Sequence, residues 1–282
     1  MMVQDRGRRR VAQIIAHAVA IPVAALFLYP YWWMLISAFR RTTDVMSDPL
    51  RLLPERFDPA VFAAIGRVGG VDLWVYIANS FVITIASTVI SVAVTALGAY
   101  ALVRKPKLPG FRFLRFGFLV TIMYPYMLLV IPVYIVMFKL GLLGTYAGII
   151  LFLALGPIQF FLFDQFFRAI PKDIIEAALI DGATELQVLR KIVVPLARPV
   201  VVTVAMITFL LNWAQWFPVL VISRLPDTYT LPVALLSMNT ELGANFQGIM
   251  ALAVLTTLPP AALFLLAQKR VMEGMASGGV KG

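Results

Sequence analysis

The chain has 282 residues, of which 61% are hydrophobic and 13% charged, and its mean hydropathy is +0.90. A water-soluble domain does not expose that much apolar surface, so the composition excludes that class and indicates a membrane protein. The formal net charge is +10. The chain has no cysteine, which excludes disulfides and thiolate metal sites, and we predict no metal site of any kind.

Six long uncharged runs follow one another along the chain, and each has the ~20 residues that a helix needs to cross a bilayer. They are 11–39, 73–103, 116–138, 140–163, 199–223 and 242–268. The apolar residues come in continuous blocks, without the alternation of a membrane barrel strand. The fold class predicted is therefore an all-α membrane protein with six transmembrane helices in a single domain, 1–282.

The basic residues are unevenly distributed between the two sides that these spans define. Of the 24 Lys and Arg residues, 17 fall in the N-terminus, the 104–115 and 164–198 connections and the C-terminus. Basic connections stay in the cytoplasm, so both termini are predicted to be cytoplasmic. The excess of basic residues on the cytoplasmic side accounts for the high pI. We therefore expect a lipid bilayer and no nucleic acid as partner. The first run is too long for the core of a cleaved signal peptide.

The connection between the fourth and fifth spans, about 168–196, predicts two helices separated by a glycine. A first short helix fits 172–181, and Gly182 suits the left-handed position that ends a helix. Thr184 and Gln187 have the spacing of a capping box, which opens a second helix. We expect this second helix to end before Pro195, where the fifth span begins.

Two interpretations of this loop follow from its residues. It is either an amphipathic helix that lies at the lipid headgroups, or a docking knob on the cytoplasmic surface. In the second case the small Ala177 and Ala178 let a partner's cleft close on the helix. Gly182 then fixes the angle between the two helices through which a movement of the partner is passed on to the spans.

The spacing of this loop resembles the signature loop of binding-protein-dependent ABC importer permeases. The matching residues are Glu176, Ala177, Ala178, Gly182, Ile192 and Pro195, with Asp181 beside the glycine and Val194 where the family has Leu. Blocks at 29–40, 79–104, 131–151 and 166–184 and the terminal GGVKG are similar to the carbohydrate-uptake branch, specifically the maltose-type second permease.

The resemblance implies an assembly in the bacterial cytoplasmic membrane. This chain would pair with a second permease subunit as a heterodimer, with two ATP-binding cassette subunits and an extracytoplasmic solute-binding protein. ATP and Mg would be bound on the partner ATPase subunits, and no cofactor by this chain. The residues named above would receive the movement of the ATPase through the helix at 172–182.

The spans themselves offer no source of energy and no catalytic residues. All 14 carboxylates fall in predicted connections, with Asp164 at a margin, and His17 is the single histidine. The sequence has no G-x-x-x-x-G-K-[ST] loop for ATP phosphates. A stand-alone secondary carrier usually needs buried ionisable groups, and an intramembrane enzyme needs a nucleophile with its base or a metal set. Both remain as less favoured alternatives.

Amides and aromatic rings in three spans are the candidates for contact with a solute. Uncharged sugars are held by amides that match their hydroxyls and by aromatic faces. The candidates are Asn212, Trp213, Gln215 and Trp216 in the fifth span, Gln159 in the fourth, and Tyr124 and Tyr126 in the third. Each could instead tie helices together or anchor at an interface. The solute expected is a sugar or oligosaccharide, and the alternative is a glycerophosphate.

Overall fold

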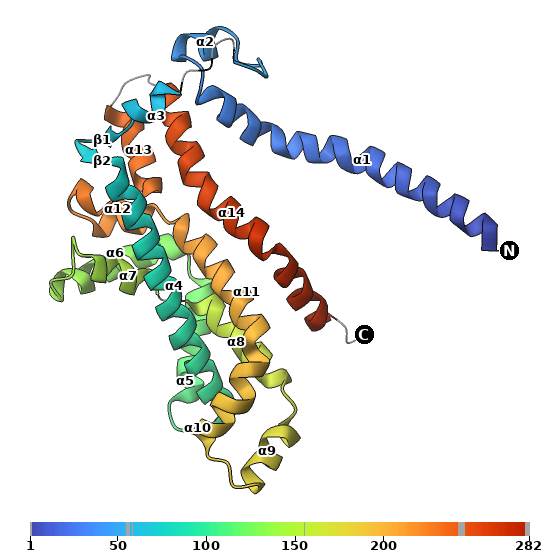
Figure 1. The fold of residues 1–282 in the computed structure, drawn as a ribbon. Helices are drawn as coiled ribbons and strands as arrows, with labels where there is room; N and C mark the ends of the chain where they lie inside the picture. Colours follow the sequence, from blue (N-terminus) through green and yellow to red (C-terminus); the bar gives the residue numbers. More distant parts are fainter. Residues whose placement is uncertain (1, 55–56, 58, 155, 242–245, 280–282) are drawn as a thin grey trace.

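The computed structural model describes residues 2–54, 57, 59–154, 156–241 and 246–279 and is mostly helical. Its centre is the long helix α4 (Leu73–Arg104), which packs mainly against α8 (Pro157–Ala169) and α11 (Val194–Trp213). Figure 1 shows these helices side by side, while most of α1 (Met2–Ser37) extends away from the bundle. The mostly helical architecture predicted from the sequence is confirmed.

Four helices in the described part of the chain are long and apolar enough to cross a membrane. They are Val11–Ser37, Leu73–Arg104, Glu185–Trp213 and Phe246–Gln268, the last belonging to α14 (Phe246–Gly279). A fifth crossing is available if α7 (Tyr146–Leu153) and α8, which meet at a 44° bend, count as one span. The second predicted span agrees closely with α4. The first 4 residues of the sixth predicted span, 242–245, lie outside the described residues.

The third predicted span, 116–138, is wrong as a single continuous helix. The structure has two helices there, α5 (Phe111–Met123) and α6 (Tyr126–Lys139). Tyr124 adopts an extended conformation, with ψ 131°, because the residue before a proline is excluded from the helical region. Pro125 also lacks the N–H that would continue the ladder of hydrogen bonds.

The predicted boundaries of the fourth span, 140–163, are wrong as well. Gly141 and Gly144 have φ of +69° and +73°, so the chain turns there instead of starting a helix. The helix α7 begins only after Thr145, whose hydroxyl accepts a hydrogen bond from the Gly148 amide at 3.1 Å. The helical part of this crossing therefore covers 146–169 and is bent before Pro157.

The prediction that a helix ends before Pro195, with a fifth span over 199–223, is also wrong. The helix is continuous from Glu185 to Trp213, and the next helix is α12 (Phe217–Ile222). A proline inside an α-helix clashes with the carbonyl four residues earlier. A π-helical turn at Leu189–Val193 directly precedes Pro195 and widens the helix there, so the helix passes the proline without a break.

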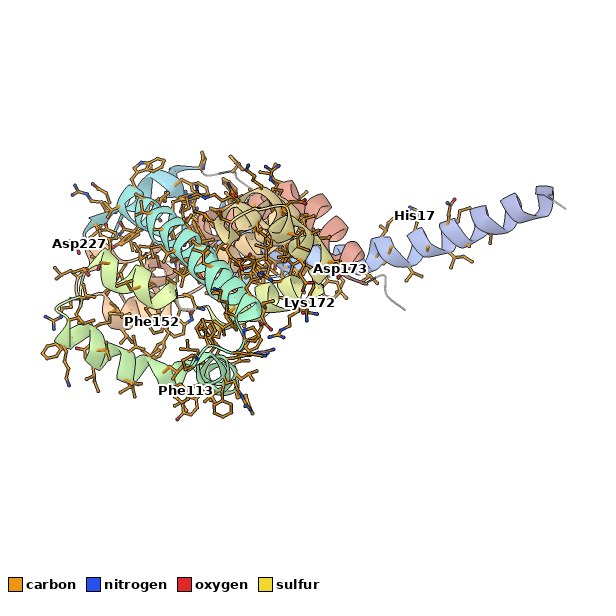
Figure 2. All side chains as sticks on the ribbon, turned by 90° about the horizontal axis from the view of Figure 1, so that it is seen from below. His17, Phe113, Phe152, Lys172, Asp173 and Asp227 are labelled. Atoms are coloured by element: carbon orange, nitrogen blue, oxygen red, sulfur yellow. The ribbon has the colours of Figure 1, made fainter. Side chains whose placement is uncertain are left out.

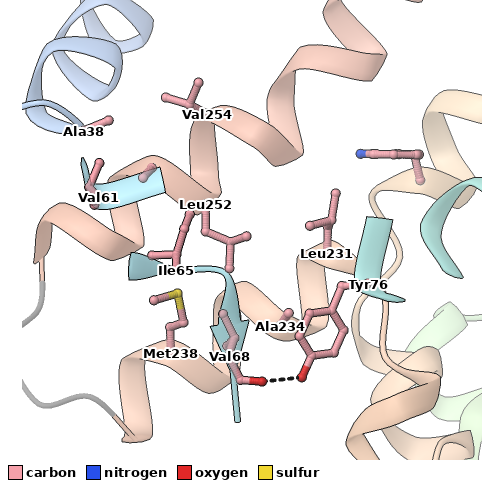
Figure 3. Packing of buried hydrophobic residues seen from close by; sticks show 12 residues of the cluster. Ala38, Val61, Ile65, Val68, Tyr76, Leu231, Ala234, Met238, Leu252 and Val254 are labelled. Carbon is pink, nitrogen blue, oxygen red and sulfur yellow. Dashed lines mark hydrogen bonds between the residues drawn. The ribbon is translucent and has the colours of Figure 1, made fainter. Parts of the chain in front are cut away.

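The remaining elements cover one end of α4, called here the hairpin end. They are α2 (Thr42–Ser47), α3 (Ala60–Ala64), β1 (Arg67–Val68), β2 (Val71–Asp72), the 3₁₀ turn Pro226–Thr228 and α13 (Leu231–Glu241). Figure 3 shows apolar side chains of α3, β1, α13 and α14 packed together here with Tyr76, whose hydroxyl donates to the Val68 carbonyl at 2.8 Å. Burying this cluster fixes the hairpin to the start of α4.

Asn79 joins α4 to two other segments at the same end. Its amide nitrogen donates to the Asp227 and Tyr229 carbonyls at 2.7 and 2.8 Å, and its oxygen accepts from the Tyr146 hydroxyl at 2.6 Å. The side chain is buried. Three partners from distant parts of the sequence therefore depend on one amide.

We expect Asn79→Leu to destabilise the fold, because three partly buried hydrogen bonds would be lost. The cost is about 2 kcal/mol, which lowers the melting temperature of a chain of this size by about 4–8 °C. Intrinsic fluorescence of the purified protein during heating measures it. Thr203→Val is the control, because the exposed Thr203 hydroxyl bonds only to Pro199 of its own helix. Equal melting temperatures for Asn79→Leu and the wild type would contradict the prediction.

Candidate functional site

The first candidate site is the segment 172–188, called here the elbow, in which two helices meet at a glycine. The helix α9 (Lys172–Ile180) is followed by Gly182 with φ +85°. The Ala183 amide donates to the Ala178 carbonyl and the Gly182 amide to the Leu179 carbonyl, at 3.0 and 3.1 Å. These two bonds form a Schellman motif, which terminates the helix and fixes the direction of the chain after it.

The second half of the elbow begins with the capping box that the sequence predicts. In α10 (Glu185–Val188) the Thr184 hydroxyl accepts from the Gln187 amide, and the Gln187 side chain accepts from the Thr184 amide at 2.8 Å. Both ends of the corner therefore have their backbone groups satisfied. This makes the elbow a defined structure and not a flexible loop.

One side of the elbow is buried against the bundle and the other is exposed. Ile175 and Val188 are buried in a cluster with side chains of α4, α8 and α11. Glu176 and Ala177 are exposed, and Ile180 keeps 85% of its surface accessible. Ile174 keeps 44% of its surface accessible, so the exposed side of α9 carries two isoleucines beside the Glu176 carboxylate.

An ion pair connects the elbow to the end of α4. The Arg104 guanidinium Nη2 lies 3.0 Å from Glu185 Oε1, and its Nε lies 3.4 Å from Oε2. Arg104 is in the last turn of α4 and Glu185 in the first turn of α10, so each charge also complements the dipole of its own helix. The end of α4 near the elbow is called here the elbow end.

The other residues of the signature spacing are dispersed over the elbow and the helix that follows. Ala178 is half-buried, and Asp181 is exposed at the end of α9. Ile192 is half-buried within the π-helical turn, and Pro195 is exposed in the first turn of α11. Of the signature residues that precede the glycine, Glu176, Ala177 and Asp181 are thus the exposed ones.

The second candidate site is a cavity of about 250 Å³ between α5, α8 and α11. It is lined by Thr121, Ile122, Tyr124, Leu153, Pro157, Ile158, Gln159, Leu211, Asn212 and Gln215. Four of the candidate solute residues, Tyr124, Gln159, Asn212 and Gln215, therefore meet at one place. Thr121 was missed by the sequence analysis, although its position one helical turn before Tyr124 could have suggested it.

Helices are interrupted on every side of this cavity. The helix α5 ends at Met123, α7 ends at Leu153 before α8 starts at Pro157, and α11 ends at Trp213. Non-helical backbone at membrane depth is tolerated where it is buried in protein or lines a cavity. The breaks and the cavity thus occur together.

The two tryptophan candidates are not among the residues that line the cavity. Trp213 is buried, its Nε1 donates to the Thr256 carbonyl at 2.9 Å, and its ring stacks on Phe209. Trp216 keeps 41% of its surface accessible and contacts Phe217. The backbone of Tyr126 starts α6, and its side chain lies outside what the structure describes.

Asn212 has a structural role in addition to lining the cavity. Its amide nitrogen donates to the Ser87 hydroxyl at 2.9 Å and to the Leu153 carbonyl at 3.3 Å. It thereby connects α11 to α4 and α7. Gln159 has its Oε1 close to where a Cβ at Gly156 would lie, so a larger residue at 156 would displace the Gln159 side chain.

No metal centre is found in the described part of the chain, where no three His, Asp or Glu side chains come together. Figure 2 shows His17 on the part of α1 that stands away from the other helices. Its Nδ1 lies 2.7 Å from the Gln13 carbonyl of the same helix. His17 is therefore remote from both candidate sites.

The fold and these two sites define a multi-pass helical membrane subunit with a helical corner at one end. Residues 60–276 match the family described as the binding-protein-dependent transport system inner membrane component. The chain belongs to this family. It is therefore a permease subunit of an ABC importer, a multi-pass inner-membrane protein and not an enzyme.

Similar proteins cover almost the whole chain. It is 31% identical to the arabinooligosaccharides transport system permease protein AraQ of Halalkalibacterium halodurans, over 98% of this chain and 100% of the relative. It is 29% identical to the diacetylchitobiose uptake system permease protein DasC of Streptomyces coelicolor, over 90% and 92%. The sn-glycerol-3-phosphate transport system permease protein UgpE of Agrobacterium fabrum is 30% identical, over 95% and 97%.

A solved structure supports the same fold. The crystal structure of a bacterial ABC transporter involved in the import of the acidic polysaccharide alginate contains a chain with a TM-score of 0.77. The two chains are 25% identical, and the match covers 92% of this chain and 96% of that one.

We expect Gly182→Ala to loosen the elbow, because a left-handed residue with a Cβ costs about 1–2 kcal/mol. Hydrogen exchange followed by mass spectrometry should show up to about tenfold faster exchange in peptides that cover 178–188. Gly98→Ala is the matched control, because a Cβ at this helical glycine meets nothing within 4 Å. Equal exchange in both variants would refute the requirement for glycine at this corner.

Proposed function

We propose that the chain forms one transmembrane domain, 1–282, that crosses the cytoplasmic membrane six times with both termini in the cytoplasm. The four long helices and the bent α7 and α8 supply five crossings, and α5 and α6 together have the length of a sixth. The basic residues support the orientation, because 17 of 24 lie on the side that carries the elbow and both termini.

In this proposal the exposed face of α9 docks in a cleft of an ATP-binding cassette subunit. The exposed Glu176 and Ala177 and the largely exposed Ile180 form a partly apolar surface on a helix whose opposite side is fixed by Ile175. Two cassette subunits carry ATP and Mg, and this chain binds neither. A second permease subunit completes a heterodimer, and a solute-binding protein delivers the solute from outside.

The observation that carries this function is the continuous helix from Glu185 to Trp213. Its first turn belongs to the elbow, and its last turn contains Asn212, which lines the cavity. A helix of 29 residues rises about 1.5 Å per residue and is therefore roughly 43 Å long. A displacement of α9 by the ATPase is thus transmitted to the solute cavity along one rigid element, and to α4 through Arg104 and Glu185.

The cavity supports an uncharged, hydroxyl-rich solute such as a sugar or oligosaccharide. Its described lining has two Gln, one Asn, one Thr and one Tyr, and none of these lining residues is charged. Amides both donate and accept, which matches sugar hydroxyls. The relatives named for arabinooligosaccharides and diacetylchitobiose favour this class.

Glycerol phosphate is the second candidate solute, favoured by the relative named for sn-glycerol-3-phosphate. A phosphate monoester carries about two negative charges, and proteins pair such groups with Arg, Lys or backbone amides. The uncharged lining described above disfavours it. A secondary carrier driven by protons or sodium is less favoured still, because the cavity lining contains no carboxylate or histidine.

Replacement of Glu176 by lysine tests the docking surface. We expect Glu176→Lys to lose the ATPase subunits during co-purification, because it reverses a charge at the contact. Asp72→Lys makes the same change at the opposite end of α4, where the carboxylate is 58% exposed, and should retain them. The proposal fails if Glu176→Lys retains the ATPase as the wild type does, or if the purified chain alone transports solute.

Replacement of Gln159 by leucine tests the solute cavity. Loss of one hydrogen bond to the solute should raise the KM for transport about tenfold while the maximal rate changes little. Uptake of arabinotriose, diacetylchitobiose and sn-glycerol-3-phosphate into proteoliposomes with the whole importer measures this. Gln247→Leu is the control, because Gln247 lies near Ala38 at the hairpin end. An unchanged KM for every solute that is transported would contradict the assignment of the cavity.

A further inference from the structure

The helix α5 forms one wall of the cavity and is the least buried element around it. The structure describes all 13 residues of α5, and none of them is buried. Three are half-buried, Phe111, Arg115 and Phe118, and their spacing places them on one face of the helix. The main neighbour of α5 is α8. Few contacts therefore determine where this wall stands.

Two contacts connect α5 to α8, and they follow each other in order. Arg115 Nη2 lies 3.0 Å from Asp164 Oδ2. One turn further along α5, the ring of Phe118 stacks on Phe160, with centroids 4.2 Å apart and an interplanar angle of 6°. Because α5 and α8 run in opposite directions, the next level along both helices contains Thr121 and Pro157. Both line the cavity.

Asp164 is suited to hold this arrangement. Its side chain is 4% exposed, and its Oδ2 also accepts from Arg168 Nε of the same helix at 2.9 Å. Oδ1 is buried and has no hydrogen-bond partner among the described residues. A carboxylate in this position is stabilised chiefly by the two guanidinium groups. Of the two guanidinium groups, only that of Arg115 belongs to a different helix, so of these two ion pairs only this one connects α5 to α8.

We propose that Asp164 and Arg115 form a clamp that positions α5 and so sets the width of the solute cavity. Asp164 is a positioning residue, because two levels of side-chain contacts separate it from the cavity lining. Arg168 pairs with the Asp164 carboxylate within α8 and does not itself contact α5 through this pair. The inference uses the cavity of the proposed function, but it concerns the geometry of the wall and holds for any solute.

The absence of cysteine makes the clamp directly testable by labelling. Thr121→Cys introduces one thiol on the cavity wall of the full importer in nanodiscs. The rate of modification is measured with N-ethylmaleimide and with a bulky biotin maleimide, and their ratio reports the width of the opening. Thr203→Cys, at a half-buried position of α11 outside the cavity lining, reports any general loosening.

We expect Asp164→Asn and Arg115→Gln each to raise the ratio of bulky to small labelling rates at Thr121→Cys about fivefold. Loss of a half-exposed ion pair shifts the balance between the narrow and the wide position of α5 by about this factor. Arg168→Gln is the matched control, because it removes a guanidinium from the same carboxylate but leaves the pair between the helices intact. It should leave the ratio unchanged, and none of the three should alter labelling at Thr203→Cys.

A second measurement keeps the test valid if Asp164→Asn does not assemble. Spin labels at Phe113→Cys on α5 and Ile158→Cys on α8 should show a broader distance distribution in Arg115→Gln than in the wild type or Arg168→Gln. The clamp is wrong if Arg115→Gln leaves both the ratio and the distances unchanged, or if Arg168→Gln changes them equally. No solute enters these measurements, so a wrong sugar assignment would leave their outcome unaffected.

Discussion

The small polar face of α4 is the contact surface on which the rest of the structure depends. Seven side chains on it are buried: Asn79, Ser80, Thr84, Ser87, Thr88, Ser91 and Thr95. Several of their hydroxyls bond to carbonyls of α4 itself, as Thr95 does to Ser91 at 2.6 Å. The Thr88 and Ser91 hydroxyls have no hydrogen-bond partner among the described residues. The small size of these side chains lets neighbouring helices approach closely. In lipid, where apolar surface alone gives no preference for protein over solvent, this close approach is a main source of helix association.

This face also determines where the helices around it can stop. Ser80 accepts a hydrogen bond from the Leu231 amide at 2.7 Å, and Ser87 accepts one from Asn212. An interrupted helix leaves amides and carbonyls without partners, and a bilayer offers none. Polar groups on α4 and amides such as Asn212 can supply them. The central helix thus permits broken helices beside it, and the solute cavity lies among those breaks.

Continuous apolar runs predicted that α4 and α1 are helices, and local turn chemistry predicted the corner at Gly182 and the capping box at Thr184. The breaks at Pro125 and Pro157 and the passage of the helix past Pro195 were harder to predict. A proline in lipid can end, bend or merely widen a helix, and the outcome depends on which neighbouring groups satisfy the freed backbone. Likewise the candidate solute residues could be listed from the sequence. Only tertiary packing shows that Gln159 lines the cavity and that Trp213 lies in the core.

The two ion pairs that join different helices at the elbow end contribute more to the positions of those helices than to the stability of the fold. Arg104 with Glu185 and Arg115 with Asp164 each include a side chain that is 40–46% exposed, and pairs of this kind contribute only ~0–1 kcal/mol. Burial of apolar clusters contributes far more to folding. Each pair does, however, join elements that are distant in sequence, the end of α4 to the elbow and α5 to α8. A pair that can break at low cost can also re-form in a different arrangement of the same helices. Such contacts are therefore suited to a protein whose helices must be held firmly in one state and released in the next.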